Sequence, residues 1–151
     1  MKIGIAADHG GFELKNQMAD YLREAGHEVI DFGAESYDAN DDFPDFVIPL
    51  SRAVGREEVE RGLAICGSGV GASIAANKVR NVRAALITET YSAHQGVEHD
   101  NLNMICLGGR VIGIELAKAI IDAFVGADYE GKERQLRRMG KVAELEKDWE
   151  S

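Results

Sequence analysis

Short apolar runs of strand type alternate with segments of helical periodicity along the chain, and this alternation restricts the fold more than any other feature. The expected strands are residues 3–7, 28–32, 63–66, 83–88 and 103–107. The expected helices are residues 12–25, 46–54, 70–78, 90–99, 114–124 and 133–147. Strands that alternate with helices form a parallel sheet covered on both faces. The sequence therefore predicts one three-layer, doubly wound, Rossmann-like α/β domain over residues 1–151, with a five-stranded parallel sheet and a C-terminal helix.

The composition indicates a small acidic globular protein. Its 151 residues, 45% apolar and 28% charged, suit one domain with one core. The net charge of −9 argues against nucleic-acid binding, which needs a basic surface. A bound anion such as phosphate would need a site in which a few basic groups and helix N-termini are brought together. No apolar run reaches the roughly eighteen residues of a membrane span, and no signal peptide is expected. The two cysteines indicate a reducing compartment, so we expect a cytoplasmic protein without nucleic-acid or membrane partners.

The carboxyl ends of the predicted strands carry the residues suited to chemistry. In an open parallel sheet, ligands bind in the crevice outside these ends. Four segments follow strands there: Asp8-His9, Cys66 to Gly71, Glu89, and Gly108 to Arg110. We expect the functional site to be assembled from them.

The run from Cys66 to Gly71 joins a predicted strand to a predicted helix. Its glycines let successive N–H groups turn toward one anion, and the helix N-terminus adds about half a positive charge. That field favours the thiolate of Cys66, which could act as a base or nucleophile. Two alternatives stay open: a buried structural cysteine, or a dinucleotide fingerprint of Gly67, Gly69 and Ala72 with Glu89 as the ribose acid. Against the second, that fingerprint normally follows the first strand rather than the third.

Asp8 and His9 follow the first strand, where a carboxylate beside an imidazole could move protons on sugar hydroxyls or bind phosphate. Alternatively, Asp8 caps the next helix. His94 and His99 are five residues apart on different helix faces, and no zinc-type motif is present, so no metal site is expected. His99 is either a general acid or an ordinary surface histidine.

Arg134 and Arg138 are four residues apart in the last predicted helix and share a face. Two guanidinium groups in that arrangement could clamp one phosphate. The alternative is a solvated face on which the arginines pair with nearby glutamates, and the pattern taken alone favours this alternative.

Together these segments resemble the type B ribose-5-phosphate isomerase family, whose relatives include galactose-6-phosphate and allose-6-phosphate isomerases. The resemblance extends over essentially the whole chain, and its most specific part is the cysteine-glycine loop followed by Ala75-Ala76-Asn77-Lys78. The other segments that carry it are Asp8-His9-Gly10-Gly11, Ser73-Ile74, Tyr91-Ser92-Ala93, His99 with Asn103, Gly109-Arg110-Val111-Ile112-Gly113, and Tyr129-Glu130-Gly131.

The resemblance implies catalysis without metal or cofactor. Cys66 would be the base that moves a proton between C2 and C1 of the open-chain sugar, with Ser68 beside it on a substrate oxygen. Some relatives use a glutamate where this chain has Ala72, which leaves Cys66 as the base. Backbone donors would stabilise the enediolate oxygen, each worth about 3–4 kcal/mol. These donors would be the N–H groups of Gly67, Ser68, Gly69, Val70 and Gly71.

The resemblance also implies how the rest of the substrate is held. His99 would open the furanose ring by acid–base transfer, and Asp8 and His9 would contact the substrate. The phosphate would be held by three arginines: Arg110, Arg134 and Arg138.

Two departures from the family pattern bear on the substrate. Asp100 stands at a substrate-binding position where members often have asparagine, and a carboxylate cannot donate to sugar oxygens. One extra residue precedes Arg134, which changes its reach toward a phosphate and so the expected length of the sugar.

We therefore expect an aldose–ketose isomerase for a phosphorylated sugar, with ribose 5-phosphate and ribulose 5-phosphate of the pentose phosphate pathway as the first pair. Two alternatives stay open: an isomerase for a galactose, allose or tetrose phosphate, and a non-catalytic phosphosugar- or nucleotide-binding module. The resemblance further implies a homodimer, or a dimer of dimers, in which His99 faces the Cys66 loop of the partner. Surplus apolar surface on the predicted helices gives weaker support for a dimer.

Overall fold

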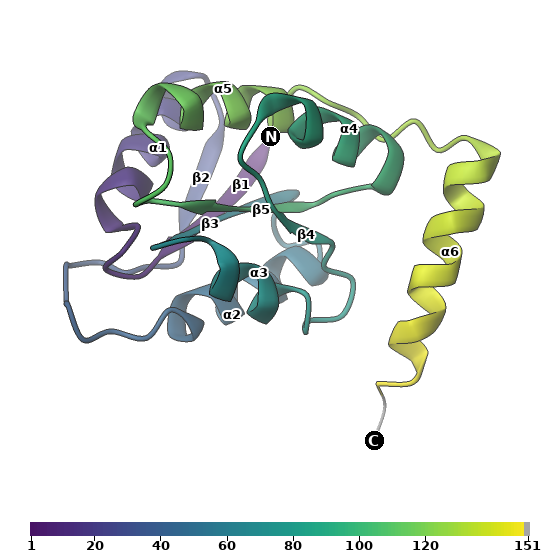
Figure 1. Cartoon of the computed structure of the whole chain (residues 1–151), viewed down its shortest axis with the longest axis horizontal. Coiled ribbons are helices and arrows are strands. Elements are labelled where there is room, and N and C mark those ends of the chain that lie inside the picture. The colour runs from purple at the N-terminus through teal and green to yellow at the C-terminus, as the bar shows by residue number, and fades with distance from the viewer. Residues whose placement is uncertain (150–151) are drawn as a thin grey trace.

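In the computed structural model, which describes residues 1–149, parallel strands form one sheet between two layers of helices (Figure 1). The strands, in the spatial order β2-β1-β3-β5-β4, are β1 (Lys2–Ala7), β2 (Glu28–Asp31), β3 (Arg61–Cys66), β4 (Ala84–Leu86) and β5 (Met104–Gly108). The helices are α1 (Phe12–Glu24), α2 (Pro44–Gly55), α3 (Val70–Ala76), α4 (Thr90–Asp100), α5 (Ile114–Val125) and α6 (Glu133–Lys147). The predicted three-layer α/β fold is confirmed.

The three central strands form because their apolar runs are covered on both sides. β1, β3 and β5 are buried along almost their whole length, which is the pattern of strands inside a two-sided parallel sheet. The edge strands are shorter and only partly buried. The strand predicted over residues 83–88 is limited to Ala84–Leu86, the three residues that pair with β5. The apolar pattern alone overestimated its length because it extends past the paired segment.

Two hydrophobic layers flank the sheet. One contains residues of α1, α4 and α5 packed against strand residues such as Ile5, Ile65 and Ile105. The other contains residues of α2 and α3 packed against Ala64 and Cys106, and it also includes Cys66. Figure 1 shows α1, α4 and α5 on one side of the sheet and α2 and α3 on the other. Cys66 therefore belongs to the α2–α3 side.

The strand order brings the predicted functional segments to one place. Ala7 of β1 is paired with Ile65 of β3, and Cys66 is paired with Gly108 of β5. After β1 the chain continues to β2, at one edge of the sheet. After β3 it continues to β4, at the opposite edge. The carboxyl ends of β1 and β3 thus form a topological switch point, the usual ligand position in open α/β sheets.

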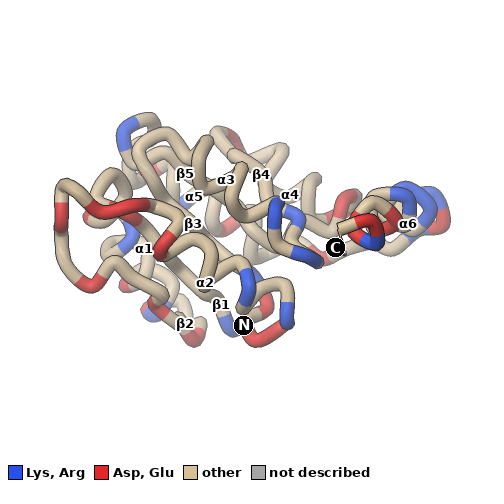
Figure 2. The backbone as a smooth tube through the Cα atoms, turned by 90° about the horizontal axis from the view of Figure 1, so that it is seen from below, with Lys and Arg blue, Asp and Glu red and all other residues tan. Residues whose placement is uncertain are grey.

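Helix α6 does not cover the sheet. It stands off the body near α4 (Figure 1), and its apolar residues Leu136, Val142 and Leu145 are 56%, 46% and 63% exposed. Basic and acidic residues both lie along it, as Figure 2 shows. A helix with an uncovered apolar stripe indicates a contact surface. None of the helices within residues 1–149 has the length and hydropathy that a membrane span needs.

Candidate active site

Three loops, after β1, β3 and β5, meet backbone to backbone at the switch point. The N–H of Gly109 donates to the carbonyl of Cys66 at 2.8 Å, and the N–H of Arg110 donates to the carbonyl of Gly67 at 3.0 Å. These bonds continue the β3–β5 ladder beyond the strands. A Cβ atom at Gly109 would lie 2.4 Å from the carbonyl oxygen of Gly10, so only glycine allows this approach.

Cys66 is the last residue of β3 and is 5% exposed. Its Sγ atom accepts a hydrogen bond from the N–H of Gly69 at 3.2 Å, at the point where α3 begins. Gly69 has φ +85°, a conformation that favours glycine, and it is the N-cap of α3. By contrast, Cys106 lies within β5, and burial raises the pKa of its thiol. Cys106 is therefore a structural cysteine.

An open pocket of 450 Å³ lies over the Cys66 loop. It brings together six of the predicted site residues: Asp8, Cys66, Gly67, Ser68, Gly71 and Arg110. Its other lining residues are Phe43 and Val111. A thiol, a hydroxyl, a carboxylate and a guanidinium thus surround one space, with the loop glycines as its floor.

Asp8 contributes to this pocket from the position directly after β1. It is 7% exposed, and its Oδ1 atom accepts a hydrogen bond from the N–H of Gly10 at 2.9 Å. The N-cap of α1 is Gly11, without a side-chain cap. The alternative that Asp8 caps this helix is therefore wrong, since its carboxylate turns into the loop instead.

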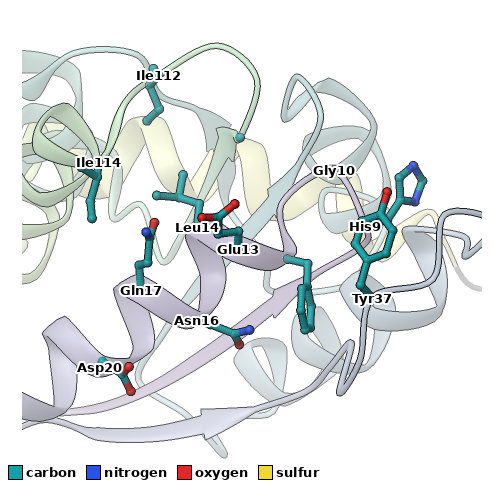
Figure 3. Close-up of a pocket in the computed structure, with 12 residues that line it drawn as sticks. His9, Gly10, Glu13, Leu14, Asn16, Gln17, Asp20, Tyr37, Ile112 and Ile114 are labelled. Atoms are coloured by element: carbon teal, nitrogen blue, oxygen red, sulfur yellow. The ribbon is translucent and has the colours of Figure 1, made fainter.

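His9 faces a neighbouring groove of 760 Å³ rather than the pocket over Cys66. Figure 3 shows its ring beside Tyr37, at the end of the groove that runs along α1. The groove and the pocket adjoin, because Asp8 and Arg110 line one while their neighbours His9 and Gly109 line the other. An extended ligand can therefore span both.

Four predicted residues lie away from Cys66 in the same chain: His99, Asp100, Arg134 and Arg138. Helix α4 starts past the carboxyl end of β4 and ends at Asp100, shortly before β5 begins, so His99 lies at the opposite edge of the sheet. The five residues of β5 separate the two edges by about 13 Å. Arg134 and Arg138 are exposed on α6. Asp100, beside His99, lines a separate hollow between α4 and α6.

The His99 ring lies between polar side chains. The Gln95 amide nitrogen is 3.2 Å from its Nδ1 atom, and Glu130 Oε2 is 3.9 Å from its Nε2 atom. Hydrogen bonds from Gln135 and Lys132 hold the pKa of the Glu130 carboxyl below its usual range, so this group is a carboxylate at neutral pH. Glu130 thus presents a fixed negative charge near the imidazole.

Two side-chain clusters in the described part of the chain have candidate metal ligands within 4.8 Å of one another: Asp8, His9 and Asp41, and Glu98, His99 and Glu130. Sequence spacing did not reveal them, since each joins residues from separate loops or helices. The expectation that no metal takes part stays a prediction. Glu89, proposed as a ribose acid under the dinucleotide alternative, is the N-cap of α4 and accepts from the N–H of Ser92 at 2.8 Å.

Two residues near the pocket were missed by sequence reasoning. The ring of Phe43 packs on the glycine loop, where a Cβ atom at Gly71 would lie 2.7 Å from it. Asp41 accepts hydrogen bonds from His9. Pro44 was the available signal, because proline is favoured in the first turn of a helix. It starts α2 two residues before the predicted position and makes Phe43 its N-cap, which ends the preceding loop beside the site.

Comparison with known proteins gives consistent matches over nearly the whole chain. The model of the Ribose/Galactose Isomerase family matches residues 3–142. The chain is 46% identical to ribose-5-phosphate isomerase B of Escherichia coli over 136 residues, which are 90% of this chain and 91% of that protein. It is 41% identical to D-erythrulose-4-phosphate isomerase of Pectobacterium atrosepticum over 87% of this chain and 86% of that protein.

Solved structures agree with these sequence matches. Ribose-5-phosphate isomerase B of Clostridium thermocellum superposes with a TM-score of 0.95 at 46% identity, covering 99% of this chain and 100% of that one. The Mycoplasma genitalium protein of the same name, solved with bound ribulose-5-phosphate, superposes with a TM-score of 0.92 at 39% identity. The match covers 97% of this chain and 96% of that one.

Proposed function

This chain belongs to the ribose/galactose isomerase family and is an aldose–ketose isomerase, and on this premise we propose that it interconverts ribose 5-phosphate and ribulose 5-phosphate. The relatives named above act on phosphorylated sugars, and one was solved with ribulose-5-phosphate. The observation that carries the proposal is Cys66, whose sulfur lies at a strand end beneath an open pocket and accepts a hydrogen bond from the loop.

In the proposed reaction, the Cys66 thiolate removes the proton from C2 of the open-chain aldose. The electron pair forms the C1–C2 double bond of the enediolate, and the negative charge moves to O1. The thiol then returns the proton to C1 to give the ketose. Backbone N–H groups of the loop stabilise the charged oxygen, because preorganised donors do not need to reorient during the reaction.

Asp8 and Ser68 are suited to the oxygen atoms of the sugar. Asp8 is a shielded carboxylate that can accept the hydroxyl proton from O2 as the carbonyl forms there and pass it to O1, which becomes the C1 hydroxyl of the ketose; Ser68 offers both a donor and an acceptor. Arg110 lines the same pocket, with its guanidinium near Gly67, and supplies a positive charge for the phosphate. His9 contacts the substrate from the adjoining groove.

We further propose that a second copy of the chain completes the site. His99, Arg134 and Arg138 lie away from Cys66 in their own chain, and α6 leaves an apolar stripe uncovered. A two-fold dimer can bring these residues to the partner's pocket and cover that stripe. Closure from two sides also removes water from around the enediolate.

A four-carbon sugar phosphate is the second candidate substrate, because a relative 41% identical to this chain is named D-erythrulose-4-phosphate isomerase. The Asp100 carboxylate and the extra residue before Arg134 both bear on sugar length. Turnover should therefore be compared across tetrose, pentose and hexose phosphates under identical conditions. A higher kcat/KM for a tetrose phosphate than for ribose 5-phosphate would replace the first proposal by the second.

The role of Cys66 is tested by Cys66→Ala, with Cys106→Ala as the matched control. Cys66→Ala should lose nearly all turnover and still bind substrate, whereas Cys106→Ala should keep its activity if it folds, because that thiol lies inside β5. Activity of Cys66→Ala within about tenfold of the wild type, a difference of only about 1.4 kcal/mol, would contradict the assignment.

The shared site is tested by complementation. Cys66→Ala and His99→Asn chains, each inactive, are unfolded together and refolded as a mixture. Random pairing makes about half of the dimers mixed, and each mixed dimer rebuilds one site of two, so about a quarter of wild-type activity should return. A mixture that stays inactive, although mixed dimers form, would mean that Cys66 and His99 act within one chain.

A further inference from the structure

We propose that Asp41 is a positioning residue for His9: it keeps the ring proton on Nδ1 and aims Nε2, as a hydrogen-bond acceptor, at a hydroxyl group of the sugar phosphate. The substrate in this inference rests on the proposed isomerase function. The pairing of Asp41 with His9 is a property of the free protein and is independent of that function.

One carboxylate oxygen of Asp41 binds residue 9 twice. Its Oδ1 atom accepts from the backbone N–H of His9 at 3.0 Å and lies 2.6 Å from Nδ1 of the ring. A carboxylate only accepts hydrogen bonds, so the Nδ1 atom must carry the proton. Among residues 1–149, no side chain is bonded to the Nε2 atom. In the neutral ring this atom therefore presents a lone pair.

The Asp41 carboxylate is held in a shielded position. Its side chain is 8% exposed, and its Oδ2 atom is buried without a hydrogen-bond partner within residues 1–149. A carboxylate with so little access to water depends on the hydrogen bonds that it does make. The hydrogen bond to the His9 ring is therefore shielded from water, and it fixes the ring in one orientation.

The loop that carries Asp41 is anchored at its start by a buried cation. Lys15 is 1% exposed, and its Nζ atom donates to both carboxylate oxygens of Asp31 at 3.0 Å and to the carbonyl of Ala34 at 2.6 Å. Ala7 at the end of β1 also exchanges backbone hydrogen bonds with Gly33 and Ala34. The other end of the loop is fixed where Pro44 begins α2. Asp41 therefore contacts His9 from a loop whose two ends are both held in place.

The ring of His9 is in a suitable place to meet substrate. It is 25% exposed and lies at the end of the groove that adjoins the Cys66 pocket (Figure 3). The ring of Tyr37 stands edge-on to it, with the two ring centroids 6.4 Å apart. Without Asp41 the ring could rotate and exchange its tautomer, so its outward nitrogen would alternate between donor and acceptor. A substrate hydroxyl would then lose a fixed partner.

The first test reads the tautomer by long-range ¹H–¹⁵N NMR of the free wild-type protein at mildly alkaline pH, with His9→Gln used to assign the signal. We expect a protonated Nδ1 and an unprotonated Nε2, and a mixture of tautomers in Asp41→Ala. Glu35→Ala is the matched control, because it removes an exposed carboxylate from the same loop and should leave the signal unchanged. A wild-type ring protonated on Nε2 would overturn the inference, whether or not Asp41→Ala folds.

The second test is kinetic. Asp41→Ala should lower kcat/KM about tenfold to a hundredfold, as the loss of an orienting partner does elsewhere. This loss should disappear in a His9→Ala background, because Asp41 then has no ring to position. A loss that persists undiminished in that background would overturn the positioning role and indicate a general effect on the loop. If wild-type protein turns over no phosphosugar while the tautomer is as expected, the proposed function fails and the pairing stands.

Discussion

Replacing Gly69 by alanine tests the close packing of the Cys66 loop. Gly69 has φ +85°, and a Cβ atom there would lie 2.6 Å from Leu86 Cδ1 and 2.9 Å from the backbone carbon of Leu107. The backbone conformation costs about 1–2 kcal/mol for a residue with a Cβ atom. The overlap adds about 1–3 kcal/mol, because Leu107 belongs to β5 and cannot move away. The free energy of unfolding should therefore fall by about 2–5 kcal/mol.

Gly26→Ala provides the matched control. Gly26 has φ +93°, and nothing lies within 4 Å of an added Cβ atom, so this variant carries the conformational cost without the overlap. Both changes restrict the unfolded chain equally, so the difference between the two variants isolates the overlap. Urea unfolding measures it as a difference in midpoint at constant m value. Equal midpoints for the two variants would refute the close approach of Gly69 to β5.

Four further predictions concern buried groups, titrating groups and the candidate metal ligands. Lys15→Met should lower the free energy of unfolding by about 1–3 kcal/mol in urea titrations, because the hydrogen bonds of a buried ammonium are lost; an unchanged midpoint would contradict the anchor. Iodoacetamide at neutral pH should alkylate Cys66 before Cys106, since burial raises the pKa of the Cys106 thiol. Peptide mass spectrometry measures the order, and alkylation of Cys106 first would contradict the prediction. Gln135→Met should raise the pKa of Glu130 toward its usual range in a carboxyl NMR titration, because it removes the hydrogen bond that contributes most to lowering that pKa. In the wild type, the contribution of this carboxylate to the free energy of unfolding is fully present above the pKa of Glu130 in the unfolded chain. It is lost as pH falls through the lower pKa of the folded state. Isomerase activity should survive prolonged EDTA treatment and dialysis, and a loss restored by one metal would show that a cluster of metal ligands is occupied in the active protein.

The sheet was predictable because its central strands are apolar on both faces. The runs before Asp8 and after Arg61 are short, apolar and followed by turn residues, which fixes both the type of element and the strand end where chemistry lies. The predicted meeting of Asp8, Cys66 and Arg110 follows from that rule, and the structure brings them to one pocket.

Other features depend on contacts that no local pattern encodes. The pairing of Asp41 with His9 joins positions 32 residues apart, in a loop with several similar acidic residues. The length of β4 depends on where β5 stops pairing with it. The distance between His99 and Cys66 follows from the direction in which α4 runs, and resemblance alone gave the expectation that a partner chain unites them.

The hydrogen bonds from the β5 loop to the carbonyls of Cys66 and Gly67 have a consequence for how this pocket adapts to ligands. Because they extend the ladder of the central strands, the amides of Gly109 and Arg110 can exchange with solvent only when the sheet itself opens there. The backbone beneath the pocket is thus tied to the central strands. We therefore expect adjustment to a shorter or longer ligand at the rim, where Phe43 ends the loop that leaves β2, and in the residues that a second copy would contribute.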